Sequence, residues 1–483
     1  MTIDRAAAIK AEWRRYSLKF VPFADAGTTE FPLAKLLRLS LFQVSVGMAT
    51  VLLIGTLNRV LIVEMKVPAS LVALMVALPL VFAPFRTLVG YKSDNHVSAL
   101  GWRRVPYIWI GTLLQFAGLS IMPFALILLS GDTWGPWWIG HVASAVAFLL
   151  TGAGLQTTQT AGLALATDLA PKEARPRVVA LMYTMLLVGM VSCGTVFAVL
   201  LNDFDQIKLI GVVQGAAVVT LVLNLIALWK QEPRSIERAR AFHANETKDI
   251  PAFREVWRRF TASPRSRRFL LAVALGTAAF NMQDIVLEPY GGEILKLSVA
   301  DTTALTALMA AGALVAFLLA ARRLMKGADP TRLAANGLVV GLAAFSCVVM
   351  SAPMEAPWLF RLGTVLIGFG GGLFSVGTLT GAMALEKDAG TGLALGAWGA
   401  VQALALGLSV AAGGVLRDVV SGLASSGLLG RALDNPSVGY MAVYHVELMM
   451  LFLTLVAIGP LVGRTAETKI HTPSTFGLAE FPT

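Results

Sequence analysis

Long apolar stretches alternate with short polar segments along most of this chain. Each stretch reaches the roughly 20 residues that a helix needs to cross a bilayer. The pattern predicts an all-α integral membrane protein with twelve transmembrane helices, at residues 37–63, 68–90, 106–129, 137–167, 178–201, 208–229, 269–290, 302–322, 332–352, 357–385, 391–416 and 440–463.

The polar segments between the spans predict two bundles of six helices. Apolar residues recur at helical intervals among the cations of the first segment, which is typical of a helix lying on an anionic leaflet. The predicted organisation is an amphipathic cytoplasmic segment at 1–36, a bundle at 37–230, a basic linker at 231–268, a second bundle at 269–463 and a cytoplasmic tail at 464–483.

The charge of the chain supports a membrane topology rather than a nucleic-acid partner. The 483 residues are 56% hydrophobic and 14% charged, with a net charge of +10. Of the 39 lysines and arginines, 32 lie on the side of the amino terminus and seven on the other. The positive-inside rule therefore predicts that both termini are cytoplasmic. Eleven of these cations lie between Lys230 and Arg268, which favours a linker near anionic lipid over a nucleic-acid interface.

The two halves share an internal pattern. The fourth and tenth spans carry the same residue spacing, with Gly154-Leu155, Thr160 and Asp168 in one and Gly372-Leu373, Thr378 and Glu386 in the other. Six plus six spans with internal repeats and a cytoplasmic connector resemble the major facilitator superfamily, whose halves enclose a midplane cavity.

The loop between the second and third spans resembles the cytoplasmic motif of that superfamily. Its residues are Gly90, Asp94, Gly101, Arg103 and Arg104. An aspartate held against an arginine can join two helix ends through charge-assisted hydrogen bonds. Asp168, after the fourth span, is interpreted as part of a structural helix end.

The seventh span ends in an unusual stretch, Phe280–Leu295. Asp284 and Glu288 lie in or beside the membrane there, where ionisable groups are costly and indicate function. Their four-residue spacing predicts one shared helix face. Pro289 with Gly291-Gly292 is predicted to end the helix. The alternative is a capped polar helix end at the water interface.

Arg59, near the outer end of the first span, is the cation that can meet these acids. The first and seventh spans are counterparts that run in the same direction. We hypothesise that Arg59 pairs with Asp284 or Glu288 and holds the outer side closed. The equally weighted alternative is that Arg59 extends to a lipid phosphate.

Other polar residues define candidate ligand positions. Polar but uncharged side chains are expected to line a cavity suited to a largely apolar ligand, namely Gln43, Gln156, Thr157, Gln159 and Thr160. Glycine-rich stretches in the tenth and eleventh spans allow close helix packing or a flat macrocycle. His141 and His445 are candidate axial ligands for a porphyrin-type metal, although a hydrogen-bonded interfacial histidine is the commoner outcome. We expect no enzyme site and no dedicated metal site.

With these residues in view, the chain resembles the PucC and LhaA type family, the bacteriochlorophyll-delivery branch of the superfamily in purple phototrophic bacteria. The resemblance covers about Leu36 to Gly463 and rests on stretches that include Gly55–Arg59, Leu100–Ile108, Gln159–Pro171, Gln283-Asp284 and Leu287–Gly292. The most family-specific of these stretches is Gln283-Asp284 with Leu287–Gly292. The residues of the family motif or gate are Asn58, Arg59, Gln283, Asp284, Glu288, Pro289, Tyr290, Gly291 and Gly292.

The resemblance implies a function in the bacterial inner membrane. It implies an assembly factor for a core or peripheral light-harvesting antenna, which handles bacteriochlorophyll a as cargo and delivers it to antenna α/β polypeptides. Partners implied in the same way are the reaction centre core complex, pigment-synthesis enzymes and membrane lipids, with no nucleic acid. The alternatives are a secondary transporter of a tetrapyrrole or other amphipathic small molecule, and a structural scaffold without pigment.

Overall fold

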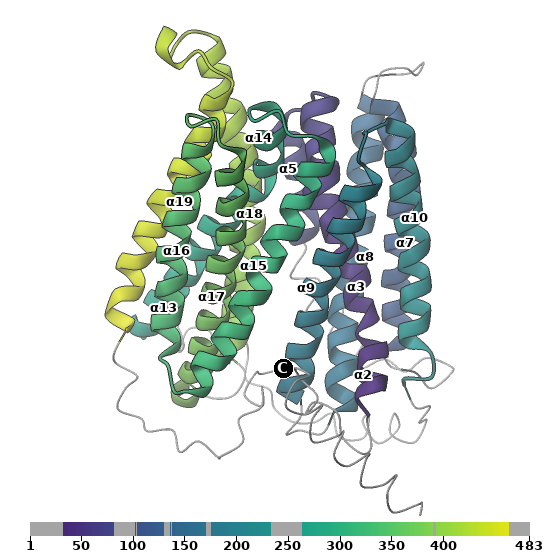
Figure 1. Ribbon diagram of the computed structural model, residues 1–483. Coiled ribbons are helices and arrows are strands. Elements are labelled where there is room, and N and C mark those ends of the chain that lie inside the picture. Colours follow the sequence, from purple (N-terminus) through teal and green to yellow (C-terminus); the bar gives the residue numbers. More distant parts are fainter. Residues whose placement is uncertain are drawn as a thin grey trace, which may run out of the picture.

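The computed structural model describes residues 32–81, 102, 104–129, 136, 138–170, 175–232, 263–389 and 393–462, and every regular element within them is a helix (Figure 1). Eleven helices in this part of the chain are long and apolar enough to cross a membrane. A shorter apolar helix, α5 (Ala69–Val81), stands where the second span is predicted. The predicted all-α membrane fold is confirmed.

The first half contains six of these helical segments. Its first span is one continuous helix of several parts, α2 (Leu33–Leu39), α3 (Leu41–Thr50), η2 (Val51–Thr56), α4 (Leu57–Arg59) and η3 (Val60–Glu64). After α5 come α7 (Val105–Leu129), α8 (Trp138–Leu169), α9 (Arg175–Leu200) and α10 (Gln206–Leu228).

The second half repeats this order. Its first span is made of α13 (Pro264–Asn281), η4 (Met282–Ile285) and α14 (Leu287–Glu293). The remaining helices are α15 (Val299–Met325), α16 (Pro330–Ser351), α17 (Pro357–Ala389), α18 (Leu393–Ser425) and α19 (Ser437–Ile458), with short turns η5 (Arg431–Leu433) and η6 (Gly459–Leu461). Residues 1–31 of the predicted amphipathic segment, most of the basic linker and the tail lie outside the described residues.

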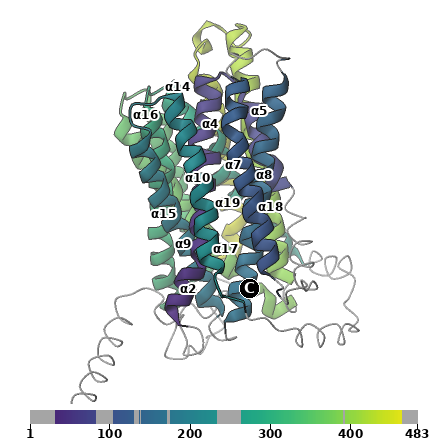
Figure 2. The ribbon, with the colours of Figure 1, turned by 90° about the vertical axis from the view of Figure 1, so that its right-hand side faces the viewer.

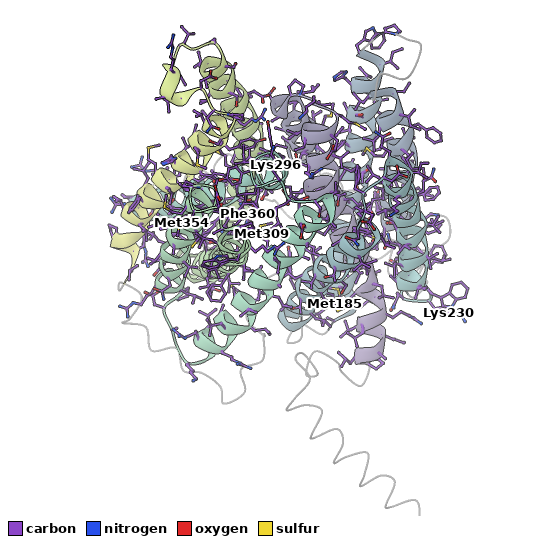
Figure 3. All side chains as sticks on the ribbon, turned by 45° about the horizontal axis from the view of Figure 1, so that its top comes forward. Met185, Lys230, Lys296, Met309, Met354 and Phe360 are labelled. Atoms are coloured by element: carbon purple, nitrogen blue, oxygen red, sulfur yellow. The ribbon has the colours of Figure 1, made fainter. Side chains whose placement is uncertain are left out.

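The two halves stand side by side, with purple-to-teal helices on one side of Figure 1 and green-to-yellow helices on the other. Figure 2, turned by 90°, shows their long helices running along a common direction. The halves meet where α18 packs on α5 and α15 packs on α9. We call this boundary the seam, and Lys296 lies beside it in Figure 3.

The largest apolar cluster among the described residues joins the two halves. The largest buried cluster draws on both halves, with Leu57 and Val72 from the first and Leu287 and Tyr290 from the second. Two smaller clusters each belong to one half, around Phe42 in the first and Leu373 in the second. Because α4 and α14 contribute to the shared cluster, the seam is packed toward the end that the charge pattern predicts to be outer.

The first and seventh spans end in the same way. Lys66 and Lys296 both adopt the left-handed conformation, each with φ of 56°. The next residues, Val67 and Leu297, donate from their backbone N–H groups to carbonyls six residues earlier, at 2.9 Å in both cases. Left-handed lysines are uncommon, so this shared helix end supports the internal repeat predicted from the sequence.

Candidate functional site at the seam

The seventh span is interrupted before the motif that was predicted to end it. α13 stops at Asn281, a 3-10 turn follows, and α14 then continues to Glu293. Pro289 lies in the first turn of α14, where a backbone N–H would have no partner within the helix. The prediction that Pro289 and Gly291-Gly292 end the helix is therefore wrong, because all three are helical.

The two acids of the motif belong to different helical segments. Asp284 lies in η4 and Glu288 in α14, so the single helix face predicted from their spacing is wrong. Asp284 is 9% exposed and Glu288 is 1% exposed. Their carboxyl groups lie within the range of electrostatic interaction with each other. The break therefore holds two buried carboxyl groups near one another.

Asn58, in α4, binds the backbone at this break. Its side-chain amide Nδ2 donates to the carbonyl oxygens of Asp284 at 3.1 Å and Ile285 at 3.2 Å. The Ile285 carbonyl is four residues before Pro289, which has no N–H to offer it. Buried carbonyls need a partner, and Asn58 supplies it from the opposite half. This explains why Asn58 and Pro289 occur in one motif set.

The first span is itself irregular where it faces the break. Its η2 and η3 segments are π-helical, with α4 between them. Such turns are rare and are often found at functional sites. Gly55, in η2, lies directly against Thr306, whose hydroxyl donates to Glu288 Oε1 at 2.9 Å. A side chain at position 55 would push the first span away from Thr306 of α15. The π-turns were not predicted from the sequence.

Arg59 crosses the seam but does not pair with either motif acid. Its guanidinium bonds to Glu64 at 2.5 Å and donates to the carbonyl oxygen of Leu297 at 3.2 Å. A Cβ on Gly292 would lie 2.8 Å from Arg59 Nε, so this glycine makes room for the guanidinium. The hypothesis of an ion pair with Asp284 or Glu288 is wrong. The left-handed turn after α14 places the Leu297 carbonyl, and not the carboxyl group of Asp284 or Glu288, at the guanidinium of Arg59.

Glu447, on α19, is a buried acid that the sequence analysis missed. It is 0% exposed, and neither carboxyl oxygen has a hydrogen-bond partner among the described residues. It lies within the range of electrostatic interaction with Asp284. Its position is ten residues into α19, about 15 Å at 1.5 Å per residue. A single acid within an apolar span was the signal available in the sequence.

Gln283 completes the polar group at the break. Its Nε2 donates to Asp284 Oδ1 at 2.5 Å and to the carbonyl oxygen of Phe280 at 3.3 Å. Within the described residues, the Oε1 atom of Gln283, Oδ1 of Asn58 and Oε2 of Glu288 lack partners. None of the three buried acids forms an ion pair with a described residue. The site therefore presents unfilled acceptors, suited to protons or to a ligand with donor groups.

A second set of charges, also missed, joins the halves at the end of the seam that the charge pattern predicts to be outer. Arg417 bonds to Glu293 at 2.9 Å and to Asp418 at 3.0 Å. Asp418 then accepts from the backbone N–H groups of Ser70 at 2.7 Å and Ala69 at 3.3 Å, at the first turn of α5. This carboxylate therefore caps a helix of the opposite half.

Tyr290 anchors the motif in the second half. It is fully buried, and its ring lies 5.6 Å from Phe360, 5.6 Å from Tyr440 and 5.4 Å from Tyr444. The contacts with the two tyrosines are edge-on, which is a favoured geometry for aromatic pairs. The motif tyrosine thus fixes α14 against α17 and α19.

The cytoplasmic motif is described in part. Gly90, Asp94, Gly101 and Arg103 lie outside the described residues. Arg104 Nε bonds to Asp168 Oδ2 at 2.9 Å, which joins the ends of α7 and α8.

The predicted cavity residues lie within the first half. Gln43 is fully buried, and both atoms of its side-chain amide lack a partner among the described residues. Gln156, Thr157, Gln159 and Thr160 are half-buried on α8. Thr157 and Thr160 donate to carbonyls of their own helix, at 2.8 and 2.7 Å.

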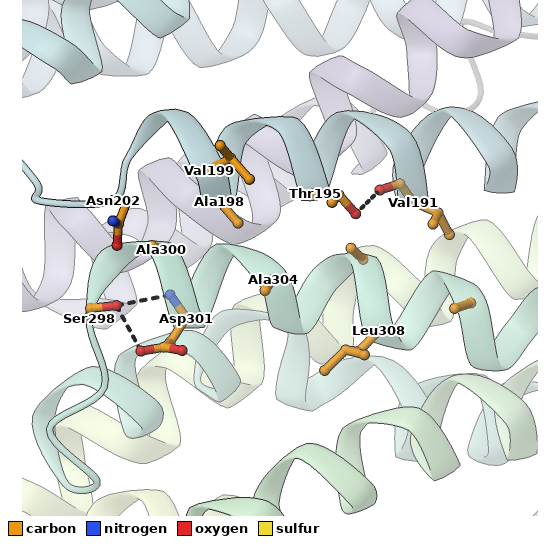
Figure 4. Close-up of a pocket in the computed structure, with 12 residues that line it drawn as sticks. Val191, Thr195, Ala198, Val199, Asn202, Ser298, Ala300, Asp301, Ala304 and Leu308 are labelled. Atoms are coloured by element: carbon orange, nitrogen blue, oxygen red, sulfur yellow. Dashed lines mark hydrogen bonds between the residues drawn. The ribbon is translucent and has the colours of Figure 1, made fainter.

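A cavity of about 510 Å³ lies elsewhere, along the seam between α9 and α15 (Figure 4). Its wall is mostly alanine and valine, and polar side chains gather toward one end, at Asn202, Ser298 and Asp301. Its size falls within the range of small-molecule sites.

The two candidate histidines differ in exposure. His141, on α8, is half-buried. His445, on α19, is exposed, and its Nδ1 lies 2.6 Å from the carbonyl oxygen of Met441. Among the described residues, no group of three or more metal-binding side chains is placed to hold an ion.

The structure is a helical membrane protein with the major facilitator superfamily fold. Over 89% of this chain and all of the other, the fold matches a crystal structure of the nucleoside transporter NupG, with a TM-score of 0.65 and 12% identity. The chain belongs to the PucC family: the family model described as PUCC protein matches residues 56–466.

Named relatives agree with this assignment. The chain is 57% identical to Protein PucC of Rhodovulum sulfidophilum, over 83% of this chain and 89% of that protein. It is 27% identical to the bacteriochlorophyll synthase 44.5 kDa chain of Rhodobacter capsulatus, over 80% of this chain and 88% of that protein.

Proposed function

We propose that this protein is an assembly factor for a bacterial light-harvesting antenna, core or peripheral, that binds bacteriochlorophyll and delivers it to antenna polypeptides. The observation that carries the proposal is the assembly of the family-specific residues into one site, where Asn58 of α4 binds the carbonyls of Asp284 and Ile285. Residues that carry the resemblance to the PucC and LhaA type family therefore contact each other across the two halves. The Rhodobacter capsulatus relative that is 27% identical is named as a chain of bacteriochlorophyll synthase.

The surroundings of the site are mostly apolar. The buried polar groups at the break are few and are enclosed by apolar and aromatic side chains. A pigment reaches the protein from the membrane, so its carrier needs apolar surface and a few polar atoms. We place the protein in the inner membrane with both termini in the cytoplasm, on the distribution of lysine and arginine. Antenna α/β polypeptides, the reaction centre core, pigment-synthesis enzymes and lipids are the proposed partners, and we propose no enzymatic activity.

The test is gentle purification from phototrophically grown membranes. Pigment extraction and an absorption spectrum report bacteriochlorophyll, and immunoblotting of the same fraction reports antenna polypeptides. We expect both to copurify with the protein. A folded, monodisperse preparation without pigment and without antenna polypeptide would reject the proposal, and antenna polypeptide without pigment would favour the scaffold.

A second candidate function is secondary transport of a tetrapyrrole or other amphipathic molecule. Glu447 favours it, because a buried acid well inside a span is a common part of proton-coupled transport. Glu447 lies ten residues into α19, so its position supports the transporter alternative. Uptake of a labelled porphyrin by sealed proteoliposomes, with and without an imposed proton gradient, separates it from the assembly factor.

A further inference from the structure

We propose that His445 is an axial ligand for the magnesium of a tetrapyrrole pigment held against the membrane-facing side of α19. The choice of a pigment as occupant rests on the proposed function. The position and chemistry of the ligand atom come from the structure.

The hydrogen bond of His445 determines which ring nitrogen is free. Nδ1 lies 2.6 Å from the carbonyl oxygen of Met441. A carbonyl oxygen can only accept, so Nδ1 carries the proton and donates it. In the neutral ring the lone pair then belongs to Nε2. Histidines that bind metals usually donate their other N–H to a backbone carbonyl or carboxylate in this way.

The free nitrogen lies in the membrane. His445 is eight residues into α19, about 12 Å from the start of the helix and about 20 Å from its end, at 1.5 Å per residue. Nε2 has no partner among the described residues. Hydrocarbon has no donor to offer it, and an unsatisfied polar group there is costly. A ligand with an open coordination position satisfies the nitrogen.

The rest of this helix face is apolar. Met449, Phe452 and Val456 follow His445 at helical spacing and are 54%, 59% and 74% exposed. A flat macrocycle needs such a surface on one side and an axial nitrogen at its centre. Methionine adapts to irregular surfaces and contacts aromatic rings favourably. The face therefore offers both a ligand atom and a packing surface, whereas His141 is half-buried.

The experiment uses full-length protein purified from cells that make no pigment and titrated in lipid nanodiscs with bacteriochlorophyll a. The variants are His445→Leu and, as a matched control, His141→Leu. Quenching of tryptophan fluorescence gives the affinity, and resonance Raman spectroscopy reports axial coordination of magnesium. We expect His445→Leu to weaken binding at least roughly tenfold, which corresponds to about 1.4 kcal/mol, and to remove the histidine-ligated signature. His141→Leu should match the wild type.

Imidazole rescue makes the test specific. The His445→Gly protein should regain the ligated signature when imidazole is added, which a merely structural role would not produce. Equal affinity and an unchanged signature in His445→Leu would overturn the assignment. So would a His445→Leu protein that keeps its pigment affinity but loses antenna polypeptides, because His445 would then contact a partner helix.

The inference and the proposed function fail in different ways. If wild-type protein binds pigment and copurifies with antenna polypeptides while His445→Leu behaves identically, only the ligand assignment is lost. If wild-type protein binds neither pigment nor antenna polypeptide, both are rejected.

Discussion

The side-chain amide of Asn58 lies 3.1 Å from the carbonyl oxygen of Asp284 and joins the first span of one half to the broken first span of the other. Asn58 is fully buried. The contact links a π-helical span to a span with a 3-10 break, so two local irregularities meet at one point of the seam.

Replacing Asn58 with alanine should destabilise the protein. Two buried carbonyls, of Asp284 and Ile285, would lose their donor, at a cost of about 1–3 kcal/mol. Thermal unfolding in detergent, followed by fluorescence-detected gel filtration, measures the effect. Asn202→Ala is the matched control, because Asn202 is exposed at the end of α9. Equal unfolding temperatures for the two variants would contradict the assigned role.

Arg59 should couple to Glu64 and not to Asp284. In a double-mutant cycle, Arg59→Ala with Glu64→Ala should give a coupling energy of about 0.5–1 kcal/mol, since the Glu64 side chain is 41% exposed and solvent weakens the pair. The cycle with Asp284→Asn should give a value near zero. A larger coupling to Asp284 than to Glu64 would restore the original hypothesis of an arginine gate paired with the motif acid.

Gly414 should control how closely α18 packs on α5. A Cβ there would lie 2.6 Å from the carbonyl oxygen of Ala69, at the contact between α18 and α5. Gly414→Leu must therefore push these helices apart, with a loss of stability of about 1–3 kcal/mol. Gly422→Leu, on the same helix with no atom within 4 Å of its Cβ position, should be neutral.

The separation of α5 and α18 can be measured by cross-linking at the same contact. Cysteine pairs placed across α5 and α18 should cross-link less in Gly414→Leu than in Gly422→Leu. Unchanged cross-linking in both variants would show that the contact between α5 and α18 does not hold the seam.

Asp418 should matter as a helix cap. Asp418→Ala removes the acceptor for the backbone N–H groups of Ala69 and Ser70, at a cost of about 0.5–2 kcal/mol. Asp418→Asn keeps one acceptor oxygen and should cost less. Thermal unfolding of the two variants gives the comparison, and a greater loss for asparagine than for alanine would refute the capping role.

Replacing Glu447 with glutamine should not destabilise the protein, in contrast to the substitutions of Asn58, Gly414 and Asp418. Its carboxyl group is fully buried and forms no ion pair with a described residue, so Glu447→Gln replaces an ionisable group with a neutral one of the same volume. We expect an equal or higher unfolding temperature. A marked destabilisation would show that the carboxyl group has a structural partner.

The same variant separates the two candidate functions. An assembly factor should retain antenna formation in cells that carry Glu447→Gln. A proton-coupled transporter should lose gradient-driven uptake in proteoliposomes.

The sequence by itself determined the fold class, the positions of the spans and the residues of the motif. Hydrophobic length is a local property, because a helix in a bilayer must satisfy its own backbone, so each span was readable without its neighbours. The repeat between halves was visible as matched spacing in the fourth and tenth spans, and the matching left-handed lysines Lys66 and Lys296 agree with it.

Only the tertiary structure decided how these residues meet. The break at Met282–Ile285 depends on Asn58, which lies more than two hundred residues earlier and supplies the missing donor. Arg59 bonds to Glu64 and to the Leu297 carbonyl because the π-turns and the left-handed turn after α14 bring these groups to its guanidinium. The proximity of Glu447 to Asp284 likewise arises from the packing of α19 against the seventh span. Helix periodicity assumes a regular helix, and both spans at this site depart from it through contacts between distant parts of the chain.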